Sequence, residues 1–486
     1  MLKTLIRKEI TETILDLRFW IVTALFLILI PLGMYVSRID YERRLANYQQ
    51  EHQMYLQHYG KNVGPSVEAQ GFRPPPMLSI FALGLDPFMP DKAITSRSGL
   101  VRPAKEPGID NPESLLFGKA DYLFNVSFIV SLAALIFTFN RISGEREKGT
   151  LRLMISGSIR RGEILLAKIV GNYLVLLAPF IIALLAALII LNTSSDVSFS
   201  STGFWPALLV IILITLLFIL VMVSLGICVS TLTHGSIASI MMLFLVWVMA
   251  VLGIPKMSPM VAEAVYPVES RNVVNLAQRI AREDIESEFS EKKSDMFKRC
   301  RSEFGITHGG ISSNPRDETE KKAYAKYDRE VVALENECQR RIANATRKLE
   351  QDYINKRNVQ ASLAVNLSRI SPVSCYTYLI SGLAKTGPAE PDKFTENAER
   401  YQEQVKAAIY DNWILKTYRL GGSSASSSDV VEGFDRSKAS IPDMKYEYMT
   451  IAEVLRTSWI DILLLFTFNI LFFAVAFWRF NKYDVR

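Results

Sequence analysis

The sequence has few of the residues and motifs from which catalytic and metal sites are usually built. It contains only four histidines among 486 residues, and they are scattered, so no metal centre is indicated. It has no G-x-x-x-x-G-K-[ST] loop, which excludes a P-loop ATPase, and no H-E-x-x-H or G-x-S-x-G motif. The fragment GLAKTG around Gly382 contains Lys and Thr but is too short for a phosphate-binding loop. We therefore predict no catalytic residue, metal ligand or cofactor in this chain.

The long apolar segments also lack charge at their centres. Six such segments have the length of about 20 residues that crosses a bilayer as a helix, and Asp121 and Asp461 lie only at segment edges. Buried helices of a soluble core are shorter and carry polar residues at helical spacing, so we predict an all-α polytopic membrane protein. Because ion-driven transporters need ionisable groups on the coupling path, energy is expected to enter another way, although a channel is not excluded.

The basic residues predict the orientation of the spans. Seven lie between the second and third apolar segments, others flank the first and last segments, and the loop NTSSDVSFSST has none. Short basic loops stay in the cytoplasm, so both termini are expected inside, and the net charge of +6 is read as a topology signal and not as a nucleic-acid footprint. The predicted division is a cytoplasmic amphipathic helix 1–18, spans 19–36, 120–140, 169–191, 205–230, 237–254 and 457–478, outer segments 37–119 and 255–456, a cytoplasmic segment 141–168 and a cytoplasmic tail 479–486.

The second outer segment predicts a helical hairpin. From about Ser270 the sequence is highly charged, and its apolar positions recur in steps of three and four, which indicates two amphipathic helices with one seam each. The longer one, Arg316–Leu367, would extend about 75 Å at 1.5 Å per residue. We expect a coiled-coil-like antiparallel hairpin with its tip near Gly309 and with arms of unequal length. The pattern fits a partner-binding stalk and a pair of helices without a partner equally well.

Cysteine is rare, which excludes a disulfide-rich scaffold. Three of the four cysteines, Cys300, Cys338 and Cys375, fall in the outer segment, where at most one disulfide can form within a chain. The pairing cannot be read from the sequence. Cys228 lies in a span and is interpreted as packing.

The segment SGEREKGT lies at the start of the cytoplasmic segment. Its charged residues fall within about one helical turn, and glycine and threonine then end or cap that turn. A short charged helix of this kind could dock in a partner's groove, but a solvated loop that only fixes topology explains it equally well. The candidate docking residues are Glu145, Arg146, Glu147, Lys148, Gly149 and Thr150.

A resemblance to a known family favours docking. The pattern E-R-E-x-G-T, followed by small residues, an Arg pair and a Lys at the next span, resembles the coupling helix of ABC-2 type permeases, the membrane subunits of bacterial ABC exporters. That family has an amphipathic helix before the first span, and this sequence has one apolar stripe opposite a charged face there. The stripe consists of Leu2, Leu5, Ile6, Ile10, Ile14 and Leu17, and the charged face of Lys3, Arg7, Lys8 and Glu12.

Two further stretches resemble a subgroup that includes permeases for copper-enzyme maturation. They are the C-terminal FWRFNKYDVR and the run RPPPMLSIFALGLD from Arg73. The apolar part of that run is too short to cross a bilayer, so it lies in the outer interface, covers an exit path or packs within the outer region. The resemblance does not cover most of the second outer segment.

The resemblance implies a function. A separate ATPase subunit would dock at Glu145–Thr150 and carry ATP and Mg²⁺, and two copies of this permease would pair, as a homodimer, in the bacterial inner membrane. The complex would export a substrate or extract it from the membrane lipid. The alternatives are a non-transporting scaffold, a sensor or mechanotransmitter for a periplasmic protein, and an ion channel.

Overall fold

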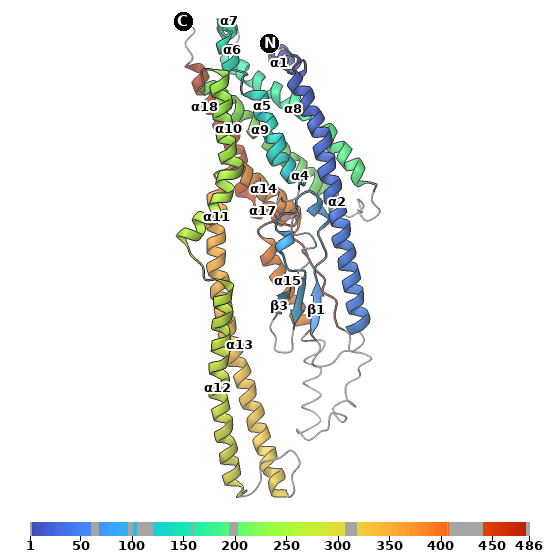
Figure 1. Cartoon of the computed structure of the whole chain (residues 1–486), viewed down its shortest axis with the longest axis vertical. Helices are drawn as coiled ribbons and strands as arrows, with labels where there is room; N and C mark the ends of the chain where they lie inside the picture. Colours follow the sequence, from blue (N-terminus) through green and yellow to red (C-terminus); the bar gives the residue numbers. More distant parts are fainter. Residues whose placement is uncertain are drawn as a thin grey trace.

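The computed structural model of the chain describes residues 2–59, 68–95, 101–104, 120–156, 160–193, 203–306, 318–405, 407 and 441–482 (Figure 1). The molecule is elongated. A helical bundle forms one end, and a helical hairpin and a smaller module project from the other. Both chain termini lie at the bundle end (Figure 1).

Six helical stretches in the described part are long and apolar enough to cross a membrane, which confirms the predicted number of spans and the polytopic all-α class. Helices suit this setting because each backbone N–H finds its acceptor within the same segment. The spans are α2 (Leu17–Tyr59), α4–η3–α5 (Tyr122–Phe124, Asn125–Val130, Ser131–Thr138), α8 (Arg161–Leu191), α9 (Phe204–Leu232), α10–η4–α11 (Ser236–Val248, Met249–Gly253, Ile254–Val265) and α18 (Trp459–Asn481).

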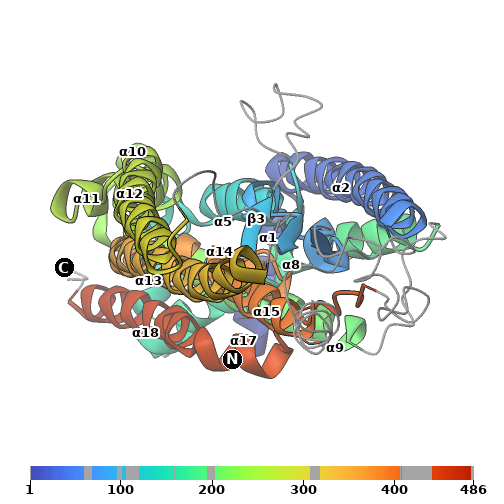
Figure 2. The ribbon, with the colours of Figure 1, turned by 90° about the horizontal axis from the view of Figure 1, so that it is seen from below.

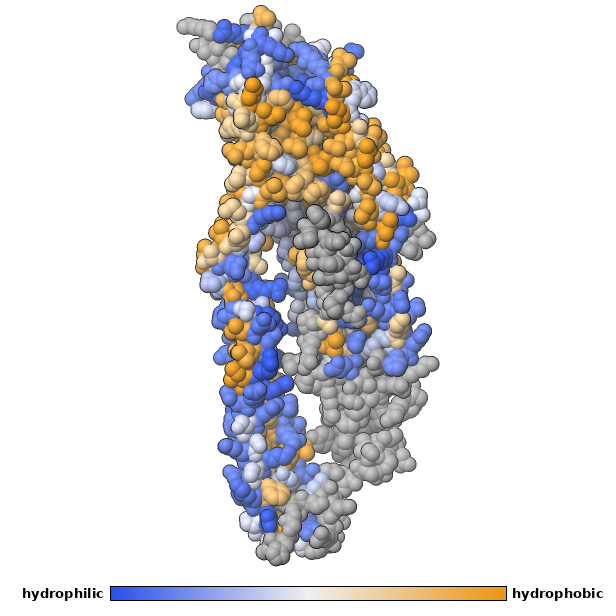
Figure 3. Space-filling model, viewed as in Figure 1, coloured by the Kyte–Doolittle hydropathy of each residue, from blue (hydrophilic) through white to orange (hydrophobic). Residues whose placement is uncertain are grey.

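The surface of the bundle fits a bilayer. On the face that Figure 3 shows, an apolar band crosses the spans, with hydrophilic surface above and below it. The four tryptophans that lie near span ends, Trp20, Trp205, Trp459 and Trp478, are all exposed, as indole rings at a membrane interface are. Inside the bundle, Phe26, Ile30 and Met34 repeat every four residues on α2 and are fully buried, so each span turns one face to its neighbours.

Three short helices accompany the termini at the same end of the bundle: α1 (Leu2–Ile14), α6 (Ser143–Glu147) and α7 (Thr150–Ser156) (Figure 1). Helix α1 packs closely on α8 at Gly171, where an added Cβ would lie only 2.8 Å from the Cβ of Glu9. The approach of these two helices therefore depends on a residue without a side chain.

The hairpin has the predicted antiparallel arms. Helices α12 (Arg271–Glu303) and α13 (Glu318–Ser368) lie side by side (Figures 1 and 2), with a seam that includes Phe289, Cys338 and Ile342. The predicted tip lies outside the described residues. The longer arm does not fold back, because its C-terminal part extends past the first residue of α12 and packs against α11.

The cysteines form no disulfide. Cys228, Cys300, Cys338 and Cys375 are all free and buried. Cys338 belongs to the seam beside Phe289, whereas Cys300 lies nearer the end of α12 and Cys375 lies in α14 (Pro372–Leu383), so the three outer thiols occupy separate environments.

The smaller module contains a sheet that the sequence analysis did not predict. Strands β1 (Ala69–Phe72), β2 (Lys92–Thr95) and β3 (Val101–Ala104) pair antiparallel in that order, and α15 (Glu390–Val405) packs against them. The lower part of α2 supports the sheet, since the N–H of Gln70 donates to the hydroxyl of Tyr55 at 2.9 Å. Four-residue strands interrupted by glycine and proline give no alternating pattern, which is why the outer region was predicted to be mostly helical.

Three short elements join this module to the bundle: η1 (Met77–Ile80), η2 (Asp86–Phe88) and α17 (Ile451–Thr457). Ile80, Phe81 and Ala82 are fully or almost fully buried in the main apolar core. The run from Arg73 therefore packs against the spans, which differs from the predicted alternative of packing within the outer region alone.

Candidate functional site

Helices α6 and α7 form a small projection at the end of the bundle, which we call the foot (Ser143–Ser156). The chain turns between them at Gly149, whose φ of +73° is accessible to glycine at little cost. No other group lies within 4 Å of the place that a Cβ would occupy there. Glycine is thus needed for the backbone conformation and not for space.

The inner side of the foot ends in buried charges. Lys168 on α8 is 1% exposed, and its Nζ donates to Glu145 Oε1 at 2.7 Å and to Glu9 Oε1 at 2.9 Å. Arg141 Nη1 lies 3.9 Å from Glu9 Oε2, and Arg141 Nη2 donates to Thr13 Oγ1 at 2.7 Å. These two cations and two anions, Glu9, Arg141, Glu145 and Lys168, form a neutral group that we call the ion cluster. It joins the foot to α1 and α8.

Arg146 connects the foot to the end of α9. Its Nη1 donates to the carbonyl of Thr233 at 2.6 Å, and its Nη2 donates to the carbonyl of Thr231 at 3.3 Å. The last carbonyls of a helix have no partner within the helix and carry partial negative charge, so a guanidinium group is a favourable cap. Arg146 therefore bonds α6 directly to the end of α9.

Glu147 makes the corresponding contact with α10. Its carboxylate accepts hydrogen bonds from the N–H of Ser236 at 3.0 Å and from Ser236 Oγ at 2.6 Å. Ser236 is the first residue of α10, and an anion is favourable beside the free N–H groups of a helix start. Through Glu145, Arg146 and Glu147 the foot thus contacts α8, α9 and α10, and Lys168 of α8 links it to Glu9 of α1.

The outer side of the foot is exposed. Lys148, Gly149, Thr150 and Arg152 lie at the surface, and Leu153 is 76% exposed, while Leu151 on the opposite face of α7 is fully buried. Of the six predicted docking residues, Glu145 and Arg146 therefore turn inward, Glu147 holds α10, and the remaining three face outward. The docking of a partner itself stays a prediction.

Sequence reasoning did not foresee the positions of four residues in and around the foot. Glu9 was assigned to neither face of the amphipathic helix, Arg141 was taken as a topology signal, and Leu153 was not singled out. Lys168 was counted as a topology signal and as the last residue of the family pattern, but no partner was predicted for it. Lys168 carried a usable signal, because it follows the apolar ILLA and precedes IV at the beginning of a span. A lysine there must find an anion or leave its charge unpaired.

A second site lies at the base of the hairpin. Arg369 donates to both oxygens of Asp461, at 2.7 and 2.9 Å, and Asp461 is 1% exposed. Ser371 Oγ donates to the carbonyl of Ala250 at 2.5 Å in η4, a π-helical turn where carbonyls lose their usual partner. The end of the hairpin is thereby held to the fifth and sixth spans.

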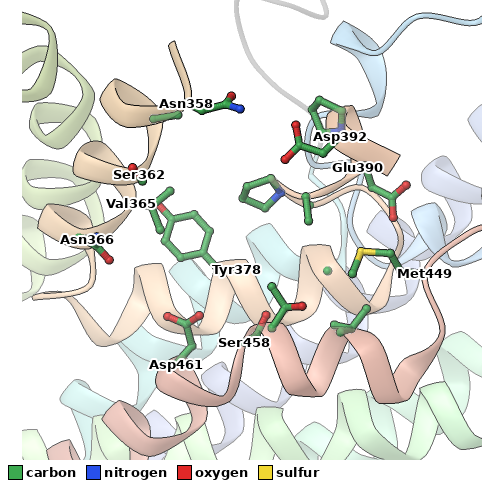
Figure 4. Close-up of a pocket in the computed structure, with 18 of the residues that line it drawn as sticks. Asn358, Ser362, Val365, Asn366, Tyr378, Glu390, Asp392, Met449, Ser458 and Asp461 are labelled. Carbon is green, nitrogen blue, oxygen red and sulfur yellow. The ribbon is translucent and has the colours of Figure 1, made fainter. Parts of the chain in front are cut away.

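The Arg369–Asp461 pair borders a cavity of about 410 Å³ (Figure 4). Asn358, Ser362 and Asn366 of α13 form one wall, and Asp392 of α15 lies on the opposite side. Among the described residues, no group of three or more His, Cys, Asp or Glu side chains is arranged to hold a metal ion. The cavity is a cleft between the hairpin and the smaller module, with a lining that is more apolar than polar.

Comparison with known protein families identifies the family of the chain. A family model described as "ABC-2 family transporter protein" matches residues 3–485, which is nearly the whole chain. No curated protein matches the sequence. The match covers the spans, the foot and both outer regions, including the part that the earlier resemblance left out.

Proposed function

The chain belongs to the ABC-2 transporter family, which makes it the permease component of an ABC transporter that pairs with an ABC ATPase subunit, and on this premise we propose how force enters it. The ATPase subunit docks on the outer side of the foot, and the inner side of the foot transmits its movement to the spans. ATP and Mg²⁺ are bound by the partner subunit, where hydrolysis takes place. Two copies of the permease pair as a homodimer and move a substrate toward the side from which the hairpin projects.

The observation that carries this proposal is the two-sided construction of the foot. Its outer side presents Leu153 beside Lys148 and Arg152, an apolar anchor with positive charges around it. Interfaces gain most of their free energy from a few such anchors, while flanking charges fix orientation and speed association. Its inner side is bonded to α8, α9 and α10 and, through Lys168, to α1, as a transmitting element requires.

Transmission follows from the short polar contacts. A push on the foot acts on α1 and α8 through the ion cluster and on α9 and α10 through Arg146 and Glu147. The spans are packed helices that move as rigid bodies, so the displacement reaches their far ends. There, the Ser371–Ala250 hydrogen bond and the Arg369–Asp461 pair pass the movement of the fifth and sixth spans to the hairpin.

The orientation of the complex is part of the proposal. The basic residues around the termini and the foot favour the cytoplasmic side of the bacterial inner membrane, and the hairpin then lies in the periplasm. Exposed apolar side chains on α2, α10 and α18 leave surface for lipid and for the second permease copy. Kinship with permeases for copper-enzyme maturation stays a prediction.

A mechanotransmitter is the alternative function that a specific observation favours. The hairpin base is bonded to two spans, and the cleft of Figure 4 separates the hairpin from the smaller module. A movement of the spans would then change the position of the hairpin on a periplasmic protein without any substrate crossing the membrane.

A matched pair of leucine variants tests the docking of the ATPase. Leu153 and Leu15 are 76% and 79% exposed at the same end of the bundle, but only Leu153 lies on the foot. The complex is purified with its copurifying ATPase and reconstituted in liposomes. Leu153→Ala should weaken ATPase binding about 5- to 30-fold, the effect of losing an interface anchor of about 1–2 kcal/mol, and lower ATP turnover, whereas Leu15→Ala should leave both unchanged. Equal effects of the two variants would contradict the proposal.

A further inference from the structure

Lys385 has an unusual backbone conformation at the end of α14. The helix closes with two hydrogen bonds, from the N–H of Lys385 to Gly382 O at 3.0 Å and from the N–H of Thr386 to Ser381 O at 2.9 Å. This Schellman arrangement places the residue after the cap in the left-handed region, where glycine is usual. Lys385 has a φ of +62°, and no other non-glycine residue among those described has a positive φ.

The neighbouring loop holds Lys385 in this conformation. Thr386 Oγ1 donates to the carbonyl of Ala82 at 2.9 Å, and the N–H of Leu85 donates to the carbonyl of Thr386 at 2.8 Å. Gly84, with a φ of +48°, allows this approach, since an added Cβ would lie 2.5 Å from that same carbonyl oxygen. A non-glycine residue kept in such a conformation is a reason to look for a role of its side chain.

The side chain of Lys385 lines an apolar cavity of about 600 Å³. The cavity lies between η1, the start of α9, the end of α14 and α17, and its volume is typical of small-molecule sites, which measure about 300–1,000 Å³. Its apolar walls include Met77, Leu78, Phe204, Leu383, Met449 and Ile451. Trp205, exposed at the same end of α9, places the cavity at the edge of the apolar band, within reach of lipid.

Lys385 carries a positive charge that this part of the protein does not neutralise. Within the described part of the chain its ammonium group makes no hydrogen bond or ion pair. It lies over the ring of Tyr448, 5.0 Å from the centroid, and Tyr448 also lines the cavity. Burial lowers the pKa of Lys385, and the opposing effect of Glu390 is smaller. The surrounding groups therefore do not fully stabilise the charged ammonium.

We propose that this cavity binds an anionic amphiphile, with its acyl chain among the apolar walls and its phosphate or carboxylate at Lys385. An anion at the ammonium group would supply the missing compensation, and a chain of methylene groups would fill space that water does not favour. The fragment GLAKTG thereby has a role that its failed match to a phosphate-binding loop had left unexplained. The assignment does not depend on ATP-driven coupling.

Photolabelling of the purified full-length protein tests the assignment. The probes are a phosphatidylglycerol and a phosphatidylcholine with the same chains and a diazirine near one chain end. The phosphatidylglycerol probe should label peptides that contain Phe204, Leu383 or Met449 at least tenfold more than the phosphatidylcholine probe. Unlabelled phosphatidylglycerol and palmitate are then added as competitors. Displacement by the first identifies a bilayer phospholipid as the ligand, and displacement by palmitate alone identifies a free fatty acid.

Two substitutions separate binding from folding. Lys385→Gly removes the charge at a position whose conformation favours glycine, so the melting temperature should be unchanged or higher. Labelling of the cavity peptides by phosphatidylglycerol should fall at least tenfold, while labelling of the exposed faces of α10 and α18 stays constant. Lys385→Arg should keep the labelling. Unchanged labelling in Lys385→Gly, equal labelling by the two probes, or no displacement by either competitor would overturn the assignment.

Discussion

Replacing Lys168 with methionine removes the cation at the centre of the ion cluster while keeping most of the side-chain volume. The buried carboxylate of Glu9 and the partly buried one of Glu145 then lose this cation, and Arg141 Nη1 stays 3.9 Å from Glu9 Oε2. Breaking a buried pair by removing one partner costs about 3–5 kcal/mol, because an uncompensated charge stays out of water. That is a large part of the roughly 5–15 kcal/mol that stabilises a typical domain.

The assay compares four proteins by urea unfolding in detergent and by ATP turnover with the copurifying ATPase. Lys168→Met should lose about 3–5 kcal/mol. Lys8→Met is the matched control, since Lys8 is an exposed lysine on α1 that pairs with Glu12 at 3.5 Å, and it should change stability by less than about 1 kcal/mol.

A triple variant separates stability from force transmission. Glu9→Gln/Glu145→Gln/Lys168→Met has no buried charge without a partner except Arg141, so most of the stability should return. Its ATP turnover should remain below that of the native protein, because weaker neutral contacts now join the foot to α1 and α8. A single variant as stable as the native protein, or a triple variant as unstable as the single one, would refute the reasoning.

Three other perturbations have defined outcomes. Gly149→Ala places a side chain on a residue with a φ of +73°, which costs about 1–2 kcal/mol. Because no other group lies near this position, α7 should reorient, and ATP turnover should fall with little change in melting temperature. Full ATP turnover in the variant would contradict the role of the turn. Burial raises the pKa of Glu390 to about 7 from 4.5, so its contribution to stability is full below pH 4.5 and is lost as pH rises through 7. At about 1.4 kcal/mol per pKa unit, the loss of stability is roughly 3 kcal/mol. The melting temperature should therefore fall between pH 5 and 8, and Glu390→Gln should remove this pH dependence. The same pH dependence in the variant would exclude Glu390 as its source. Arg369→Met should destabilise the protein by about 3–5 kcal/mol because it leaves the buried carboxylate of Asp461 without its partner. In unfolding measurements, Arg369→Met/Asp461→Asn should recover most of this stability. A double variant that loses the sum of the two single-variant losses would contradict the pair.

The spans and the hairpin were predictable because strong physical constraints act on them. Lipid requires apolar side chains and closed backbone hydrogen bonding over about 20 residues, and the sequence shows six such blocks. Two long helices that share one seam need apolar residues in steps of three and four, and Cys338 and Ile342 follow that pattern.

The small sheet could not be predicted, since strands of four residues such as Ala69–Phe72 carry too little pattern. The contacts of the foot's charged side chains could not be predicted either. The same run of Glu, Arg, Glu and Lys is compatible with contacts to solvent, to an ATPase or to the protein's own helices. Glu145 turns inward to Lys168, 23 residues away, and Lys168 also holds Glu9, which is 159 residues away in the sequence.

The central claim, that an ATPase subunit docks on the outer side of the foot, is tested most directly by cross-linking in the active complex. All four native cysteines are buried, so Leu153→Cys introduces one accessible thiol on the foot, and Ser290→Cys places one on the exposed surface of the hairpin. With a short bifunctional reagent, Leu153→Cys should cross-link to the ATPase subunit and Ser290→Cys should not. Cross-links from Ser290→Cys alone, or none from Leu153→Cys in a complex that hydrolyses ATP, would contradict the account.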